Sequence, residues 1–340
     1  MSVSYGGDSI VFADGSVNAS GFIGHRNRII NGAMVIDQRN AGASITPTDS
    51  QYSVDRWKTR LTQSSKYTVQ QNSGSVTPPL GFKNYLGAVS SSAYSLLSTD
   101  YFLLVQPIEG FNTADLGWGA VGAQTVTLSF WVRSSLTGTF GGSLREGNGG
   151  TAAYPFTYTI NNANTWEYKT ITVTGPTTGT WQTTTSNSID LMFSLGAGTT
   201  YSGTAAAWTS SNHFSVTGAT SVVGTNGATF YITGVQLERG STASSFEYRP
   251  YGTELALCQR YYETGITGAG SRSLDNYGVY AGVFKVTKRA NPTVTYVATG
   301  AAGGLGGYYL GPNTDGFVGY STSTTAGSGY YFTYTAAIEL

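Results

Sequence analysis

VTLSFWVRS, at residues 126–134, is the stretch that decides the fold. Apolar side chains alternate with other side chains along it, and an alternation of period two places each set on its own face of a β-strand. One face receives Val126, Leu128, Phe130 and Val132, and the opposite face receives Thr127, Ser129, Trp131 and Arg133. The stretch therefore predicts a strand that buries its aliphatic face in a core.

Further strand-like stretches lie on the C-terminal side, and clusters of Gly, Asn, Pro and Thr divide them. They are WEYKTITVTG (166–175), IDLMFSLG (189–196) and ATFYITGVQLERG (228–240). Successive strands without an intervening helical pattern are typical of a β-sandwich or barrel. No repeat of about 20–50 residues is visible, which disfavours a solenoid or a propeller. We expect an all-β fold.

The composition agrees with this fold class. The 340 residues include 46 Gly and 24 Tyr, and 13% are aromatic. Glycine suits turns and aromatic residues suit strands, whereas both rank low as helix formers. The 18 basic and 18 acidic side chains give a formal net charge of zero. A nucleic-acid-binding protein would show a basic patch, and a near-neutral chain favours a surface shielded by assembly over a free monomer.

The chain divides into four expected segments. They are an N-terminal attachment segment (1–25), the sandwich (26–252), a short bridging helix (253–263) and a small C-terminal β domain (264–340). The first contains strand pieces around a turn at Asp14-Gly15. The helical candidate is TELALCQRYYE, with Thr253 as its N-cap, and GITGAGSRS (265–273) predicts a loop after it. The last segment would be marginally stable alone, so we expect it to associate between subunits.

Catalysis, metal binding and membrane insertion have no support in the sequence. Cys258 is the only cysteine and lies in a short apolar stretch, and His25 and His213 are far apart. We find no GxSxG, HExxH or P-loop motif. No apolar run approaches the ~20 residues of a membrane-spanning helix, and the N-terminus lacks the pattern of a secretory signal. We therefore expect a non-enzymatic protein, without metal or cofactor, that is made in a cytosol.

Residues near the start of the expected sandwich predict structural roles. Asn31-Gly32 predicts a tight turn where the chain enters the sandwich. Asp55 and Arg56 predict a buried ion pair against Trp57, and we expect this indole in the core.

Two glutamates predict structural roles at strand ends. Glu109, which precedes Gly110, predicts a turn whose carboxylate accepts backbone amides. Glu238 lies at the end of the last long strand, and we expect it to close the sandwich together with Phe246 and Glu247.

Several phrases of this sequence resemble a recurring module of bacteriophage tail and virion proteins, in the same order. They are RNRIINGAMVIDQRNAG (26–42), YSVDRWK (52–58), QPIEGFN (106–112), VTLSFWVRSSLTGTF (126–140), YTINNANTWEYKTITVTGPTTGTW (158–181), ATFYITGVQLERGSTASSFEYRP (228–250) and ELALCQRYYE (254–263). Together they span residues 26–263. The segment that begins VFKVTKRANPTVTY (283–296) also resembles the C-terminal part of such proteins.

The resemblance implies a jelly-roll sandwich, similar to carbohydrate-binding modules, on a virion tail or fibre. The function it implies is attachment to a host-surface glycan by a tail fibre or baseplate-attached fibre subunit. A ligand-free baseplate or head subunit, such as a decoration protein or head fibre, is the alternative, and a polysaccharide depolymerase is a third reading. Many related jelly rolls hold a structural calcium ion through an acidic residue in the last strand. Thr233-Gly234 replaces that residue here, which argues against calcium.

Sugar binding requires exposed aromatic rings, because a ring stacks on the apolar face of a pyranose. Trp131 and Arg133 share the polar face of their strand and suit this role. The other candidates are Trp166, Trp181, Tyr201 and Trp208. The alternative is that this face packs on a neighbouring subunit or within the core.

The expected assembly is a homotrimer in the virion tail, formed in the host cytoplasm. Fibres that present sandwiches symmetrically are generally three-fold, and Gly-rich strands such as AAGGLGGYY (301–309) permit close approach of backbones at an axis. The N-terminal segment is expected to bind other virion proteins, and host-surface polysaccharide is the expected ligand.

Overall fold

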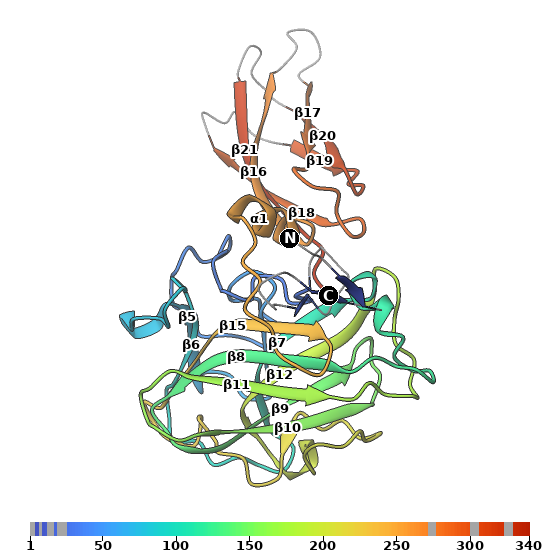
Figure 1. Cartoon of the computed structure of the whole chain (residues 1–340). Coiled ribbons are helices and arrows are strands. Elements are labelled where there is room, and N and C mark those ends of the chain that lie inside the picture. The colour runs from blue at the N-terminus through green and yellow to red at the C-terminus, as the bar shows by residue number, and fades with distance from the viewer. Residues whose placement is uncertain are drawn as a thin grey trace.

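Two five-stranded antiparallel β-sheets lie face to face in the larger part of the molecule (Figure 1). The computed structural model describes residues 4–6, 9–11, 17–18, 26–270, 277–299, 306–322 and 329–340. The first sheet contains β10 (Ala153–Ile160), β9 (Gly138–Glu146), β12 (Asn187–Ala197), β7 (Tyr101–Glu109) and β4 (Lys58–Leu61), in that order. The second contains β11 (Glu167–Val173), β8 (Val126–Ser134), β15 (Thr229–Arg239), β6 (Leu86–Ser90) and β5 (Tyr67–Gln71).

The strand order is that of a jelly roll. If the strands from β6 to β12 and then β15 are counted as one to eight, the second sheet reads 6-3-8-1 and the first reads 5-4-7-2. The chain therefore crosses between the sheets as in a double Greek key. Strands β4 and β5 each extend one sheet by a strand. The predicted all-β jelly-roll sandwich is confirmed.

Short elements connect the strands of the sandwich. They are the 3₁₀ helices η1 (Ser73–Ser75), η2 (Gly110–Asn112), η3 (Ala114–Leu116) and η4 (Thr199–Tyr201), and the short paired strands β13 (Ser202–Gly203) and β14 (Ser215–Val216).

The core lies between the two sheets and follows the alternation seen in the sequence. Val126, Leu128, Phe130 and Val132 of β8 are fully buried. The ring of Phe130 meets that of Phe193 from β12 edge-on, with centroids 4.9 Å apart. Trp57 is also fully buried in this core. Burial of one such side chain stabilises the fold by about 1.5–3 kcal/mol. A shift of one residue in the register of β8 would expose all four side chains, so the alternation fixes the register.

The helix between the two parts of the molecule begins earlier than expected. Helix α1 spans Tyr251–Gln259, with Pro250 at its N-cap position, so Thr253 lies inside the helix and does not cap it. Proline fixes φ near the helical value and needs no backbone donor, which suits a helix start. Residues 265–270, the described part of the loop expected at 265–273, belong to strand β16 (Tyr262–Gly270), every residue of which pairs with β21. Tyr262 and Glu263, expected in the helix, also belong to this strand.

Residues beyond α1 form two three-stranded sheets that lie above the sandwich in Figure 1. One has the order β16-β21-β18, with β21 at Gly329–Ala337 and β18 at Thr293–Thr299. The other has the order β17-β20-β19, with bounds Tyr277–Val283, Gly316–Thr322 and Gly306–Leu310.

The interior of this C-terminal part contains aromatic side chains and one buried ion pair. Phe317 and Tyr334 meet edge-on, with ring centroids 4.9 Å apart. Lys288 Nζ lies 2.6 Å from the Glu263 carboxylate, and both side chains are fully buried. The hydroxyl of Tyr334 donates to the same carboxylate over 2.8 Å.

The chain end returns to the sandwich and fastens the C-terminal part to it. Arg289 donates to the carbonyl oxygens of Ile338 and Glu339, over 2.7 Å each. The oxygen of Leu340 accepts hydrogen bonds of 2.8 Å from the Tyr52 hydroxyl and from Lys58 Nζ. We call residues 338–340 the C-terminal clasp.

The clasp also explains why one expected ion pair is wrong. Arg56 does not pair with Asp55; it forms an ion pair with Glu339 of the clasp. Asp55 pairs instead with Arg39, whose NH1 lies 2.6 Å from the carboxylate. The guanidinium of Arg56 lies over the ring of Tyr261, 3.6 Å from its centroid. Asp55 and Arg56 lie in a turn in which Arg56 has a left-handed φ of 70°, and the two side chains find partners that are distant in sequence.

The N-terminal segment is described in part. Strands β1 (Ser4–Gly6), β2 (Ser9–Val11) and β3 (Val17–Asn18) form a small antiparallel sheet. The expected turn at Asp14-Gly15 and the glycines at 303 and 304 lie outside the described residues. Within the described residues, no helix has the length and hydropathy needed to cross a membrane.

Candidate functional site

Aromatic side chains gather on the outer face of the sheet that contains β8. Trp131 and Tyr168 are cross-strand partners on β8 and β11, with ring centroids 5.4 Å apart. Two residues along β8, Arg133 is opposite Tyr231 of β15, and its guanidinium lies 5.4 Å from that ring. We define the aromatic face as Trp131, Arg133, Trp166 and Tyr168.

Trp166 joins this surface from the loop before β11. Its ring packs against Tyr85 and Tyr231, at 5.5 and 6.4 Å between centroids. The indole N–H donates to the carbonyl oxygen of Thr77 over 2.9 Å. Burial raises the pKa of the Tyr85 phenol, which donates to the carbonyl oxygen of Ser73. These bonds fix the orientation of Trp166 before any ligand arrives.

The aromatic face combines accessible rings with unused donors. Tyr168 is 44% exposed, and Trp131 and Arg133 are half-buried. The Nε–H of Arg133 donates to the carbonyl oxygen of Asn164 over 3.0 Å, which anchors the guanidinium. In the described part of the chain, neither terminal nitrogen of Arg133 has a hydrogen-bond partner. The rings of Trp131 and Tyr168, tilted by 51° to each other, lie beside these free N–H groups. An accessible ring can stack on a pyranose, and the N–H groups can bind its hydroxyls.

Trp181 and Trp208 lie elsewhere, in a cluster with Trp118 at one end of the sandwich. The three rings meet edge-on, with centroids 4.8–5.5 Å apart. Each indole N–H donates to a backbone oxygen, of Thr178, Thr174 and Gln124 respectively. The indoles are thus engaged in packing and hydrogen bonds within the fold.

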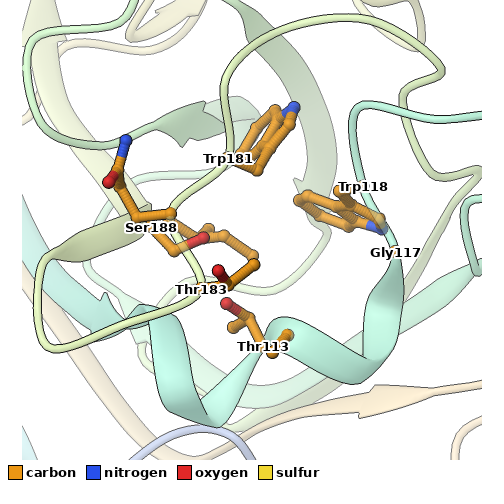
Figure 2. A pocket seen from close by; sticks show the side chains of 9 residues that line it. Thr113, Gly117, Trp118, Trp181, Thr183 and Ser188 are labelled. Carbon is orange, nitrogen blue, oxygen red and sulfur yellow. The ribbon is translucent and has the colours of Figure 1, made fainter.

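A small cavity lies beside this cluster, and Figure 2 shows Trp118 and Trp181 on one side of it with Thr113, Thr183 and Ser188 on the other. Its volume is about 30 Å³. That is room for about one water molecule, so no sugar ring fits there.

Tyr201 belongs to a third location, on the outer face of the other sheet. Its ring stacks on Phe214, with centroids 4.7 Å apart, and meets Tyr101 edge-on at 5.2 Å. These rings cover Leu103, Val105 and Met192. Of the six expected glycan-binding residues, the structure therefore brings together Trp131, Arg133 and Trp166.

Asn31 and Gly32 form the turn where the chain enters the sandwich. The Met34 N–H donates to the Asn31 carbonyl oxygen over 3.0 Å, and Asn31 has a left-handed φ of 59°. The Asn31 side chain donates to the carbonyl oxygens of Ile36 and Asp55. A Cβ on Gly32 would overlap the carbonyl oxygen of Val235 from β15, so only glycine permits this approach.

The partners expected for Glu109 are wrong. Its carboxylate accepts from Arg260, over 2.6 and 3.0 Å, and from the Tyr261 hydroxyl over 2.5 Å. It therefore joins β7 to the end of α1 rather than binding amides of its own turn. Burial raises the pKa of the Tyr261 phenol, so this hydroxyl keeps the proton that it donates.

Glu238 closes the end of β15. Its carboxylate accepts from the backbone N–H and the hydroxyl of Ser244, over 2.8 and 2.6 Å. Nearby, the Glu247 carboxylate accepts from the backbone N–H of Asn27 over 2.7 Å. Together these bonds join the start and the end of the sandwich.

The residues at the position of the implied calcium site do not fit the ion. Thr233 donates its hydroxyl proton to the carbonyl oxygen of Asn84 over 2.7 Å. A Cβ on Gly234 would lie 2.6 Å from the ring of Phe82, so an apolar group occupies the space of a carboxylate. No cluster of three His, Cys, Asp or Glu side chains that could hold a metal occurs among the described residues. Calcium requires several hard oxygen ligands.

The sequence did not reveal a pocket of about 350 Å³ at the junction with α1. Its wall includes Phe82, Tyr248 and Tyr251, which come from two separate segments. The closely spaced aromatic residues of FEYRPY (246–251) are the signal that could have indicated part of it.

The strand order defines the fold as a jelly-roll β-sandwich. No family model and no curated protein matches the chain. Similar solved structures include the enzymatically active domain of tailspike protein 4 from bacteriophage CBA120, at 15% identity and a TM-score of 0.36. That match covers 64% of this chain and 22% of the tailspike chain, so this chain spans about a fifth of it.

Two carbohydrate-binding modules are also similar. TmCBM61, in complex with β-1,4-galactotriose, is 12% identical with a TM-score of 0.31, and the match covers 63% of this chain and 99% of that one. The family 11 module of Clostridium thermocellum, in complex with a mixed-linked tetrasaccharide, is 12% identical with a TM-score of 0.28. That match covers 60% of this chain and 97% of the module. The strand order of the two sheets assigns the fold independently of these similarities.

Proposed function

We propose that this chain is a non-enzymatic structural subunit of a phage virion that attaches to host-surface glycan through the aromatic face. The observation that supports this most directly is the pair of neighbouring rings, Trp131 and Tyr168, beside the free terminal nitrogens of Arg133. A bound sugar uses both, because the rings stack on its apolar face while the N–H groups bind its hydroxyls.

The position on the particle is part of the proposal. The sequence phrases over residues 26–263 resemble phage tail and virion proteins, which favours a tail fibre or a baseplate-attached fibre. The N-terminal segment would bind other virion proteins, and three copies would assemble in the host cytoplasm. The carboxylates of Asp55, Glu109, Glu238 and Glu263 have structural partners, so we propose binding without bond cleavage.

A glycan array with the purified full-length chain tests this function. Saturable binding is expected for the native chain, and Trp131→Ala should weaken it about five- to tenfold, since loss of one stacked ring costs on the order of 1–1.5 kcal/mol. Phe111→Ala is the matched control, because Phe111 is an exposed aromatic residue at η2, outside the aromatic face.

Two results would contradict the proposal. Absence of binding to any glycan, with the chain present in purified virions, would indicate a ligand-free structural subunit. Release of reducing sugar from host polysaccharide would indicate a depolymerase.

A further inference from the structure

The pocket at the junction with α1 is a second concave site, and we call it the junction pocket. Three segments line it: residues 27–35, where the chain enters the sandwich, 81–84, before β6, and 246–254, which lead into α1. Its volume of about 350 Å³ lies in the range of about 300–1,000 Å³ that is usual for ligand sites.

The walls of the junction pocket are aromatic and accessible. Phe82, Phe246 and Tyr248 contact one another, with ring centroids 4.9–5.5 Å apart. Tyr248 is 58% exposed and Tyr251 is 64% exposed. A Cβ on Gly81, at a φ of +91°, would lie 2.7 Å from the Tyr248 hydroxyl, so glycine allows this ring to lie close to the loop.

The floor of the pocket is a fixed network of charges. The guanidinium of Arg249 donates to the carbonyl oxygens of Ile29 and Asn27, and lies 3.4 Å from Glu254 and 3.6 Å from Glu247. The Arg249 side chain is only 5% exposed. Its Nε–H is buried and has no acceptor among the described residues.

Charged side chains of both signs line the junction pocket, and some of their donors and acceptors are free. Lys83 is exposed and forms no ion pair within the described residues. One oxygen of Glu247 accepts from Asn27, and the other has no donor in the described chain. Two basic and two acidic side chains therefore line the pocket, with donors and acceptors both available. An anion would meet the carboxylates of Glu247 and Glu254, whereas a hydroxyl both donates and accepts.

We propose that the junction pocket is a second carbohydrate-binding site, which takes an uncharged pyranose unit. The sugar ring stacks on Tyr251 or Tyr248, and its hydroxyls bind Lys83 and Glu247. This inference rests on the proposed glycan-binding function and adds a site and a ligand class to it. An apolar side chain from another protein would bury Lys83 and the free oxygen of Glu247 without partners, which is costly.

The test measures residual sugar binding after the aromatic face is disabled. Neutral gluco-, galacto- and manno-oligosaccharides of two to six units are titrated into the full chain, with matched uronic-acid oligomers beside them, by saturation-transfer NMR. The Trp131→Ala chain should still bind a neutral oligosaccharide. Addition of Tyr251→Ala or Lys83→Ala should weaken that residual binding about tenfold. Phe111→Ala in the same background should leave it unchanged, and the melting temperature verifies that each variant folds.

Three outcomes would overturn the inference, and they differ from one another. If the native chain binds glycan and Trp131→Ala abolishes all binding, the junction pocket is not a sugar site, while the proposed function stands. If residual binding prefers uronic acids and falls with added salt, the ligand class is wrong. If the native chain binds no glycan, the proposed function fails, and the inference fails with it.

Discussion

At the scale of single residues, burial sets the chemistry of Asp55. It raises the pKa of this carboxyl from 3.8 to about 6, although Arg39 and the backbone N–H of Gln38 act in the opposite direction. The folded chain thus holds a proton that the unfolded chain releases. This residue's contribution to stability is greatest below about pH 4 and is lost as the pH rises through about 6.

The Asp55→Asn variant isolates this contribution. The native chain should lose about 2 kcal/mol of unfolding free energy relative to the variant between pH 4 and pH 6.5, because most of the shift is titrated in this range and one pKa unit corresponds to about 1.4 kcal/mol. Urea unfolding at several pH values measures the difference. A difference that grows with pH would show that the pair with Arg39 outweighs desolvation.

A second residue-scale prediction concerns the turn at the start of the sandwich. Gly32→Ala should lower the unfolding free energy by about 1–3 kcal/mol, because the added methyl group would overlap the Val235 carbonyl oxygen. Gly252→Ala is the matched control, since nothing lies within 4 Å of a Cβ there. This control lies in α1 and should be neutral or slightly stabilising. Equal effects of the two changes in chemical denaturation would contradict the close approach.

At the scale of elements, the C-terminal sheets depend on the buried pair Lys288–Glu263. Lys288→Met should destabilise them by about 3–5 kcal/mol, because it leaves a carboxylate buried without its counter-ion. Arg60→Met, which removes an ion pair with side chains 33% and 45% exposed, should cost at most about 1 kcal/mol. Hydrogen exchange of β16 and β21 provides the measurement. Unchanged protection in the Lys288 variant would show that the pair is dispensable.

The sequence pattern predicted correctly those elements that interactions between near neighbours determine. The alternation in β8 predicted its buried face, because period two needs no knowledge of distant residues. The start of α1 and strand β16 were missed because Pro250 and the pairing with β21 decide them. The partners of Glu109 lie about 150 positions away, at Arg260 and Tyr261, and no local spacing indicates them. The junction pocket likewise combines three distant segments.

At the scale of the whole molecule, the C-terminal clasp joins the two parts. Glu339→Gln should weaken this attachment, because the fully buried Arg56 would lose its counter-ion. Limited proteolysis should then release the C-terminal part faster than from the native chain. Asp315→Asn is the control, since this carboxylate is exposed and distant from the clasp in sequence. Equal cleavage rates for both variants would show that the clasp does not hold the two parts together.

The same feature bears on how the molecule would transmit force. The C-terminal part is fixed at both ends of its chain: it begins at α1, and its final residues return to the base, where the Ile338 N–H donates to the Tyr261 carbonyl oxygen over 2.8 Å. Force applied to the C-terminal part is therefore transmitted to the sandwich by two routes. One is the backbone through α1, and the other is the set of hydrogen bonds and ion pairs of residues 338–340. Such a joint resists rotation of the C-terminal part, because residues 338–340 must detach from the sandwich before that part can swing about the covalent link through α1.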